Sequence, residues 1–357
     1  MIDEIANCSY HLTTGLTRMG HKVSVLLDVQ RRVNRLLFTQ KVPKGSEVIW
    51  IHPLPIKPRA LGLFFPMIRA ILRLRPQIIH VQYLWSQFFI GFIASKLLRV
   101  PIVATGHGWE VIDVPKERVR GKIQKQFLKR ADMIILTAEY YHKFLEEIVP
   151  RERLIHIPRM IDTEMFRPGI PCDDLIKKYG NHIVTFVARL FKVKTPYKTL
   201  KAFRLALDSI PDAKLLILGK GPEEQGMRQM VKELQMEDSV HFLGEVPNNE
   251  IPKYLNASKA EVRGFNPLTP ELGISHLEAL ACGTPVLTYN DYPDVKGMII
   301  CLQTEEIGKA LIKILADEQY QHKLGLAGRE YVMKNFSIEA GTRKTLQVYK
   351  DLLRKRS

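Results

Sequence analysis

The stretch PELGISHLEALACGTPV, residues 270–286, is the most informative part of this 357-residue chain. Its apolar positions have the spacing of a short helix over about 272–281, and Gly283 is placed to end that helix. A helix that begins beside a turn leaves its first backbone amides without intrahelical partners. We therefore expect the amides of Gly273 and Ile274 to form an anion site.

Two carboxylates belong to this segment. Glu278 follows Glu271 by seven positions, which is two helical turns, so both lie on one helix face. A carboxylate at Glu278 can accept hydrogen bonds from vicinal hydroxyls such as those of a ribose. The alternative is a capping box between Ser275 and Glu278, and the residues alone leave the two interpretations about even.

Short apolar runs recur along the whole chain, each followed by a segment of helical length. They are rich in Val, Ile and Leu without alternation, which is typical of strands covered on both faces. Strands alternating with helices predict parallel, doubly wound sheets, and a chain of this length accommodates two. The expected strands are His21–Leu27, Val48–Ile51, Ile78–Val81, Ile102–Thr105, Met133–Thr137, His182–Ala188, Lys214–Leu218, Val240–Leu243, Pro285–Thr288 and Met298–Cys301.

A break in this pattern near residues 166–174, rich in Pro and Gly, predicts the domain boundary. We expect an N-terminal domain over 1–166, a C-terminal domain over 167–337 and a last helical segment over 338–357. The first helix is expected to begin near Asp3, which leaves no residues for a strand before it. We therefore expect the chain as given to lack the first, central strand of its N-terminal sheet, whose two neighbours would stay about 9–10 Å apart.

Cations and glycines follow three of the expected strands. Arg189 and Lys194 lie past a buried strand, at the sheet edge where α/β proteins bind ligands. Two cations there can neutralise a diphosphate, or they are ordinary surface charge. Gly219 and Gly221 follow the next strand, where a plain turn explains them equally well. His107 stands between two glycines that would let its ring face a cleft, although a lone histidine is more often structural.

The net charge of +16 is unevenly placed: residues 1–150 hold 22 Lys and Arg against 11 Asp and Glu. Such a surface suits an anionic partner, namely phospholipid, nucleic acid or a phosphorylated substrate, or it only solvates the protein. Leu61–Leu74 interleaves large apolar residues with Arg69 and Arg73, as membrane-surface helices do. An ordinary amphipathic crossover helix is the alternative and the more frequent explanation.

Several classes of protein are not expected. A content of 46% hydrophobic and 25% charged residues is that of a globular protein. The four cysteines have no C-x-x-C spacing and no signal peptide is visible, which predicts a cytoplasmic protein without disulfides or zinc. The uncharged stretch Pro76–Ser95 contains too many polar residues for a membrane span. Asp-x-Asp, His-x-x-x-His and P-loop patterns are absent, so we expect neither a metal-held diphosphate nor a P-loop.

Taken together, these segments resemble the GT-B nucleotide-sugar glycosyltransferases, most of all the retaining glycosyltransferase family four, over nearly the whole chain. The stretch 278–286 matches the family signature Glu-Ala-x-Ala-x-Gly-x-Pro-Val. Further matches are Arg189, Leu190 and Lys194 in an Arg-Leu…Lys element, Gly219–Pro222, Val240–Gly244, the interdomain segment Ile157–Pro168, Gly20-His21, His80 and His107-Gly108.

This resemblance implies two Rossmann-like domains facing across a cleft, with residues 338–357 packing back toward the first. It implies that Glu278 holds the donor ribose and that Glu271 lies near the donor sugar. Arg189 and Lys194 would steady the diphosphate without a metal or other cofactor, and His107 would line the cleft beside the anomeric carbon. The rest of the expected donor site is Gly219, Gly221, Gly273 and Ile274.

The resemblance predicts a retaining glycosyltransferase that uses a nucleotide-sugar donor and a sugar or lipid-linked acceptor, plausibly at the inner face of a membrane. Three departures from the family pattern motivate an alternative, a non-catalytic nucleotide-sugar-binding relative or partner subunit. Only six residues separate Glu271 from Glu278, Arg159-Met160 replaces the usual Asn-Gly, and Asp3-Glu4 replaces a glycine pair. A nucleic-acid-binding protein is supported only by charge, and no nucleic-acid partner is expected.

Overall fold

The computed structural model describes residues 4–28, 44–52, 59–84, 86–113, 120–263, 272–289, 295–301 and 303–356. The chain forms two compact units, the first of Met1–Met160 with Ile338–Ser357 and the second of Ile161–Ser337. The division therefore falls after Met160 rather than after Phe166. Ile161 makes a parallel bridge with Ser337, and Phe166 is buried in the core of the second unit.

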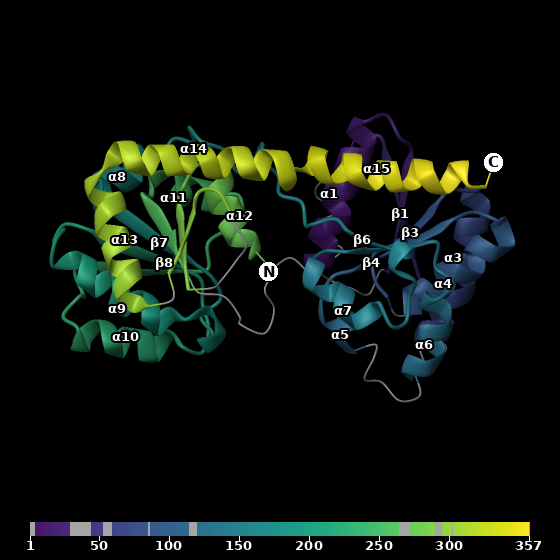
Figure 1. The fold of residues 1–357 in the computed structure, drawn as a ribbon, viewed down its shortest axis with the longest axis horizontal. Coiled ribbons are helices and arrows are strands. Elements are labelled where there is room, and N and C mark those ends of the chain that lie inside the picture. Colours follow the sequence, from purple (N-terminus) through teal and green to yellow (C-terminus); the bar gives the residue numbers. More distant parts are fainter. Residues whose placement is uncertain are drawn as a thin grey trace. The chain divides into compact units, whose positions relative to one another are not determined.

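The first unit contains two parallel sheets (Figure 1). One pairs β1 (Val23–Asp28) with β2 (Ser46–Ile51), and the other has the order β3 (Ile79–Val81), β4 (Ile102–Gly106), β5 (Met133–Leu136) and β6 (Leu154–His156). Its helices are α1 (Glu4–Arg18), α3 (Arg59–Leu74), α4 (Ser86–Leu98), α5 (Trp109–Asp113), α6 (Arg120–Leu128), α7 (His142–Leu145) and α15 (Ile338–Arg354).

Alternate residues of the central strands bury opposite faces of the four-stranded sheet. Val103 and Ile135 pack with Val348 and Leu352 of α15. The residues that alternate with them along the strands, such as Ala104 of β4, face the other side of the sheet. They belong to the core formed with α3, α4 and α6. Both faces of this sheet are thus covered by helices, as the continuous apolar runs predict.

Among the described residues, β1 is bonded only to β2, and β3 only to β4. The segments Val23–Leu27 and Ile79–Val81 therefore do not pair directly. The missing strand stays a prediction.

The second unit contains one parallel sheet of the order β12, β11, β10, β7, β8, β9. The strands are β7 (Ile183–Val187), β8 (Lys214–Leu218), β9 (Val240–Gly244), β10 (Ala260–Val262), β11 (Val286–Thr288) and β12 (Met298–Ile300). The helices are α8 (Asp173–Tyr179), α9 (Pro196–Leu207), α10 (Glu224–Glu233), α11 (Ile251–Ala257), α12 (Ile274–Ala281), α13 (Thr304–Ala316) and α14 (Glu318–Asn335). The chain order reverses between β7 and β10, and such a switch point opens a ligand crevice at the carboxyl ends of these strands.

The predicted class of α/β protein with two doubly wound, Rossmann-like units is confirmed. Two strands were not predicted, β6 and β10. Each has three residues, and β10 carries the buried charge of Glu261, so neither forms an apolar run.

The stretch Pro76–Ser95 divides between β3 and the start of α4. None of the helices in the described ranges has the length and apolarity that crossing a bilayer requires.

Candidate functional site

Three loops at the carboxyl ends of β7, β8 and β9 are held together by backbone contacts. The amide of Leu190 donates to the carbonyl of Lys220 (3.0 Å), and that of Gly219 donates to the carbonyl of Gly244 (2.7 Å). A Cβ on Gly219 would lie 1.9 Å from the carbonyl oxygen of Ala188, and φ there is +138°. A Cβ on Gly221 would lie 2.4 Å from the carbonyl oxygen of Leu190. Both glycines are therefore needed for this close approach.

The same contacts place two of the predicted cations. Arg189 is exposed, and its guanidinium lies over the ring of Phe191 at 5.3 Å. Lys194 ends a 3-10 turn and is half-buried. Lys194 also lowers the pKa values of Glu261 and His276, so its ammonium lies near the end of β10 and the start of α12. Positive charge therefore gathers at the switch point of the second unit.

Helix α12 begins as the anion-site prediction requires. Gly273 is its extended N-cap, Ile274 is its first residue, and no side chain among the described residues caps the helix. The capping-box interpretation of Ser275 and Glu278 is therefore wrong. At the other end Gly283, with φ +78°, donates to the carbonyl of Leu280 and Thr284 donates to that of Ala279, as in a Schellman motif.

Glu278 is half-buried on α12, and burial raises its pKa to about 7 against the opposing effect of Arg263. Close to it lies a buried polar cluster that the sequence did not reveal. The Nε of Arg263 is 3.7 Å from Oε1 of Glu261 and 3.5 Å from Nε2 of His276. Burial raises the pKa of Glu261 to about 7 and holds that of His276 well below its usual range. Glu271 lies outside the described residues.

His107 belongs to the first unit, directly after β4, and is 4% exposed. Its backbone is held on both sides: its amide donates to the carboxylate of Glu110, and its carbonyl accepts from Nη2 of Arg159 at 2.8 Å. Burial, with the charge of Arg159 and the ring of His80, lowers the pKa of His107 to about 3. The imidazole is therefore neutral near pH 7. The donor-site residues belong to the second unit.

Sequence reasoning missed both residues that hold His107, the nearby Glu110 as well as Arg159, which is far away in the chain. Arg159 is 52 positions away. Glu261 lies in β10 and Arg263 directly follows it, but this three-residue strand forms no apolar run that would mark it in the sequence. Among the described residues, no group of three or more His, Cys, Asp and Glu side chains could hold a metal ion, and metal independence stays a prediction.

The second unit thus has a parallel α/β sheet with positive charge gathered at its switch point. A family model described as "Glycosyl transferases group 1" matches residues 173–331, and one described as "Glycosyltransferase Family 4" matches residues 5–165. The chain belongs to this family of group 1 glycosyltransferases.

Known proteins similar to this chain have related names. This chain is 24% identical to N-acetyl-alpha-D-glucosaminyl L-malate synthase of Bacillus anthracis, and the alignment covers 95% of this chain and 91% of that protein. It is also 24% identical to alpha-monoglucosyldiacylglycerol synthase of Acholeplasma laidlawii, covering 99% and 95%. The crystal structure of HepE of Anabaena in complex with UDP and glucose has the same fold, with a TM-score of 0.71, 16% identity and coverage of 97% and 96%.

Proposed function

We propose that this protein is a retaining glycosyltransferase that moves a sugar from a nucleotide-sugar donor to a hydroxyl acceptor. The observation that carries the proposal is the switch point of the second unit. There, the close backbone approach at Gly219 and Gly221 holds the loop that carries Arg189 and Lys194, and the charge of Lys194 acts on His276 in the first turn of α12.

The proposed chemistry follows from where charge develops. Breaking the bond between sugar and phosphate builds negative charge on the leaving diphosphate. Arg189 can pair with a phosphate through its fork, Lys194 supplies a second charge, and the amides of Gly273 and Ile274 supply donors at the positive helix end. Groups fixed before the reaction stabilise this charge without reorganisation, and they do so without a metal ion.

Glu278 is proposed to hold the ribose of the donor. Both of its oxygens act purely as acceptors when it is ionised, and its pKa of about 7 places it near half ionisation in the free protein. Hydroxyl donors favour the ionised form, so donor binding releases a proton at Glu278. Glu271 keeps its proposed place near the donor sugar, and His107 is proposed to contact the substrate beside the anomeric carbon.

The acceptor is proposed to be a lipid-linked or cell-envelope glycan. Relatives named for a glycolipid or a cell-envelope polymer include an alpha-monoglucosyldiacylglycerol synthase and a poly(glycerol-phosphate) alpha-glucosyltransferase. The first unit carries a surface suited to a membrane. No acidic residue lies between Glu47 and Glu110 of the sequence, so the basic residues of α3 and α4 have no acidic neighbours in this stretch.

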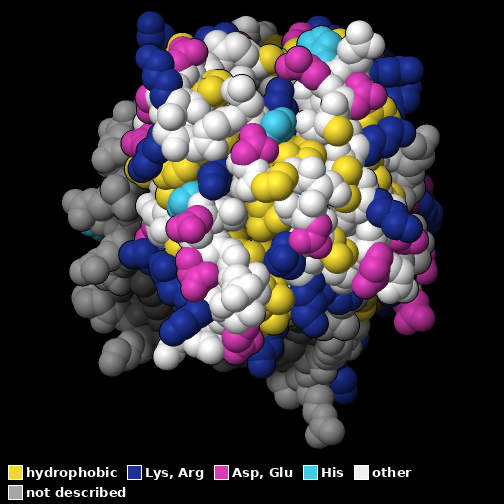
Figure 2. Space-filling view, turned by 90° about the vertical axis from the view of Figure 1, so that its left-hand side faces the viewer, with side chains coloured by type: hydrophobic (Ala, Val, Ile, Leu, Met, Phe, Trp, Pro, Cys, Tyr) yellow, Lys and Arg dark blue, Asp and Glu magenta, His cyan; other side chains and the backbone are white. Residues whose placement is uncertain are grey.

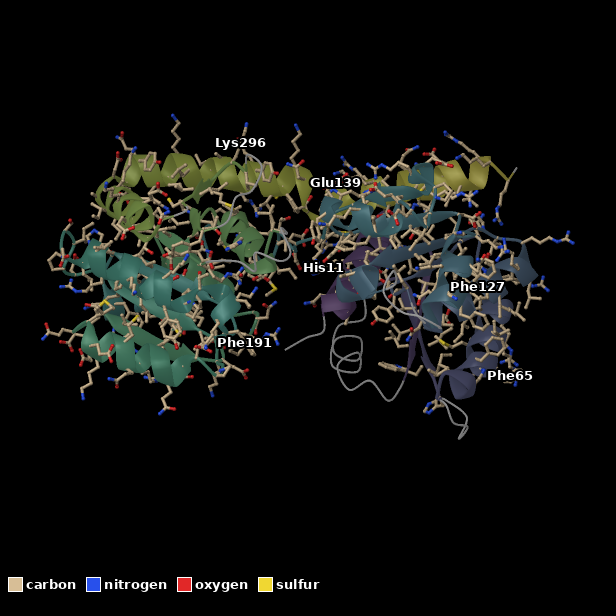
Figure 3. The ribbon with its side chains drawn as sticks, turned by 60° about the horizontal axis from the view of Figure 1, so that its bottom comes forward. His11, Phe65, Phe127, Glu139, Phe191 and Lys296 are labelled. Atoms are coloured by element: carbon tan, nitrogen blue, oxygen red, sulfur yellow. The ribbon has the colours of Figure 1, made fainter. Side chains whose placement is uncertain are left out.

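The surface of α3 combines charge with apolar side chains. Phe65 is 65% exposed and projects from α3 (Figure 3). Phe65 also lines an open pocket of about 610 Å³ on the same helix. The other residues that line it are Ile68, Arg69, Leu72, Arg73 and Arg75. The face of the second unit in Figure 2 instead mixes Lys and Arg with Asp and Glu. We therefore propose that α3 binds anionic phospholipid, which would place the protein peripherally on the cytoplasmic face of a membrane.

Turnover tests the proposal. The purified chain is incubated with UDP-, GDP- and ADP-sugars and with vesicles of phosphatidylglycerol and diacylglycerol, and release of the nucleoside diphosphate is measured. We expect release with one donor, unchanged in EDTA. Activity lost in EDTA and restored by magnesium or manganese would contradict metal independence. Donor binding without release in any acceptor mixture would favour the non-catalytic relative.

A further inference from the structure

A chain of side-chain hydrogen bonds in the first unit links the last helix to His107. The hydroxyl of Tyr349, on α15, is 2.5 Å from Nδ1 of His80. Nε2 of His80 is 2.7 Å from the hydroxyl of Thr105 and 3.2 Å from the amide nitrogen of Gln82. The amide oxygen of Gln82 is 3.3 Å from Nε2 of His107. His80 and Tyr349 are 269 positions apart in the sequence.

The direction of each bond follows from which groups can donate. Burial lowers the pKa values of His80 and His107 to about 3, so each ring carries a single N–H. The amide nitrogen of Gln82 only donates, so Nε2 of His80 accepts and its Nδ1–H donates to Tyr349. The amide oxygen of Gln82 only accepts, so it receives Nε2–H of His107.

This direction leaves Nδ1 of His107 with a lone pair. In the part of the chain that the structure describes, this nitrogen is buried and has no hydrogen-bond partner. A buried polar atom without a partner costs free energy, and a bound ligand is one way of satisfying it. Since Arg159 and Glu110 already fix the backbone of His107, the chain through Gln82 sets the remaining variable, the tautomer of the ring.

We propose that Gln82 and Tyr349 are positioning residues that hold His107 in the tautomer whose Nδ1 accepts a hydrogen bond from a hydroxyl of the bound substrate. The inference rests on the proposed function, in which His107 contacts the substrate. It makes α15 part of the site, although that helix follows the whole second unit in the sequence. Neither residue touches the substrate itself.

Substitutions at Gln82 separate positioning from packing. Gln82→Glu keeps the size of the side chain and an oxygen acceptor, so His107 should keep its Nε2–H tautomer. Gln82→Leu removes the acceptor and should let the Nδ1–H tautomer of His107 appear. Losing one hydrogen bond of about 1 kcal/mol corresponds to a shift of about fivefold in the ratio of tautomers.

Tyr349→Phe tests the far end of the chain. It leaves Nδ1–H of His80 without an acceptor, which favours the other tautomer of His80 and reverses the Gln82 amide. The reversed amide donates to Nε2 of His107, so its Nδ1–H tautomer should again increase. Gln347→Leu is the matched control, because this exposed side chain of α15 donates a hydrogen bond to Asp351 of the same helix and lies outside the chain that leads to His107.

The measurement is long-range ¹H–¹⁵N NMR of the full chain labelled at histidine, with the His107 signals assigned from the spectrum of His107→Asn. We expect Nδ1 of His107 to be unprotonated in the wild type, Gln82→Glu and Gln347→Leu, and partly protonated in Gln82→Leu and Tyr349→Phe. An Nδ1–H tautomer in the wild type, or no change in Gln82→Leu, would overturn the proposal. Because the spectra need no substrate, this outcome is independent of whether the protein turns over a nucleotide sugar. If it does, kcat should fall with the fraction of the correct tautomer.

Discussion

The candidate sites of the two units are held by different kinds of contact. In the second unit, backbone packing around Gly219 and Gly221 and the open end of α12 position exposed or half-buried cations. In the first unit, His107 is 4% exposed and neutral, and side chains from distant segments hold it. Arg and Lys side chains that bind a diphosphate can remain solvated until the ligand binds. A neutral ring that must present one tautomer needs a dry, bonded setting.

The comparison can be tested first by adding one methyl group to a glycine of each site. At Gly219 the new Cβ meets the backbone of Ala188, and φ is +138°, whereas at Gly106 it meets the side chain of Val111 at 2.5 Å. The backbone atoms at Gly219 cannot move away from the added methyl group, whereas the side chain of Val111 beside Gly106 can change its conformation. We expect Gly219→Ala to lower the free energy of unfolding by about 3 kcal/mol and Gly106→Ala by about 1–2 kcal/mol.

Urea unfolding of both variants measures this difference. Gly180→Ala is the control for positive φ alone, since φ is +85° there and no atom lies within 4 Å of the added Cβ. Because ψ is −173°, this backbone conformation is essentially restricted to glycine, and the alanine should cost about 1–2 kcal/mol, less than the backbone clash at Gly219. Equal losses for Gly219→Ala and Gly180→Ala would mean that the close approach of the two loops does not constrain the second site.

The second test concerns the exposed cations. Arg189→Ala should weaken binding of a nucleotide sugar by about tenfold or more, because a hydrogen bond to a charged group contributes about 1.5–3 kcal/mol. Lys192→Ala removes a neighbouring exposed charge from the same turn and should change the affinity little. Calorimetric titration of both variants with the donor that binds the wild type makes the comparison. Equal losses of affinity in the two variants would mean that Arg189 acts only through the general surface charge and does not contact the donor.

The third test asks whether the positive charge of the first unit serves a different partner. Arg73→Glu should weaken binding to phosphatidylglycerol vesicles by about 2 kcal/mol, or roughly thirtyfold, at about 1 kcal/mol for each charge removed or added. Lys232→Glu, on α10 of the second unit, makes the same change in net charge. Vesicle sedimentation at rising salt measures both. A similar loss in both variants would show that net charge, and not α3, governs binding.

The smallest expected effect is on the pH dependence of stability. The folded-state pKa of Glu261 is raised from 4.5 to about 7 by burial, against the charges of Arg263 and Lys194. Its stabilising contribution is therefore complete below about pH 4.5 and is lost as the pH rises toward 7. Relative to the wild type, Glu261→Gln should lose less stability between these pH values, as followed by urea midpoints. Parallel curves would mean that the carboxylate is not held neutral in the fold.

The difference between the two sites also explains how far the sequence could predict them. Gly219, Arg189 and Glu278 each lie directly after a strand or on a short helix, so local patterns place them at one sheet edge. The glycine cap at Gly283 was predicted for the same reason. Local patterns also predicted the helices on both faces of each sheet.

The setting of His107 could not be predicted in this way. Its tautomer depends on Gln82 and Tyr349, and nothing in the sequence near His107 marks Tyr349 as a neighbour. The cluster of Glu261 and Arg263 was missed because charged residues hide a three-residue strand from any search for apolar runs. Packing of α15 against the sheet brings Tyr349 to His80, whereas Glu261 and Arg263 are only two positions apart.

The central claim is that the second unit binds a nucleotide sugar through Glu278. Its most direct test is the melting temperature of the wild type and of Glu278→Gln in EDTA with UDP-, GDP- and ADP-sugars, since a ligand bound only by the folded state raises it. We predict that one donor raises the melting temperature of the wild type and that Glu278→Gln loses most of this increase. An equal increase in both proteins, or none with any donor, would contradict the claim.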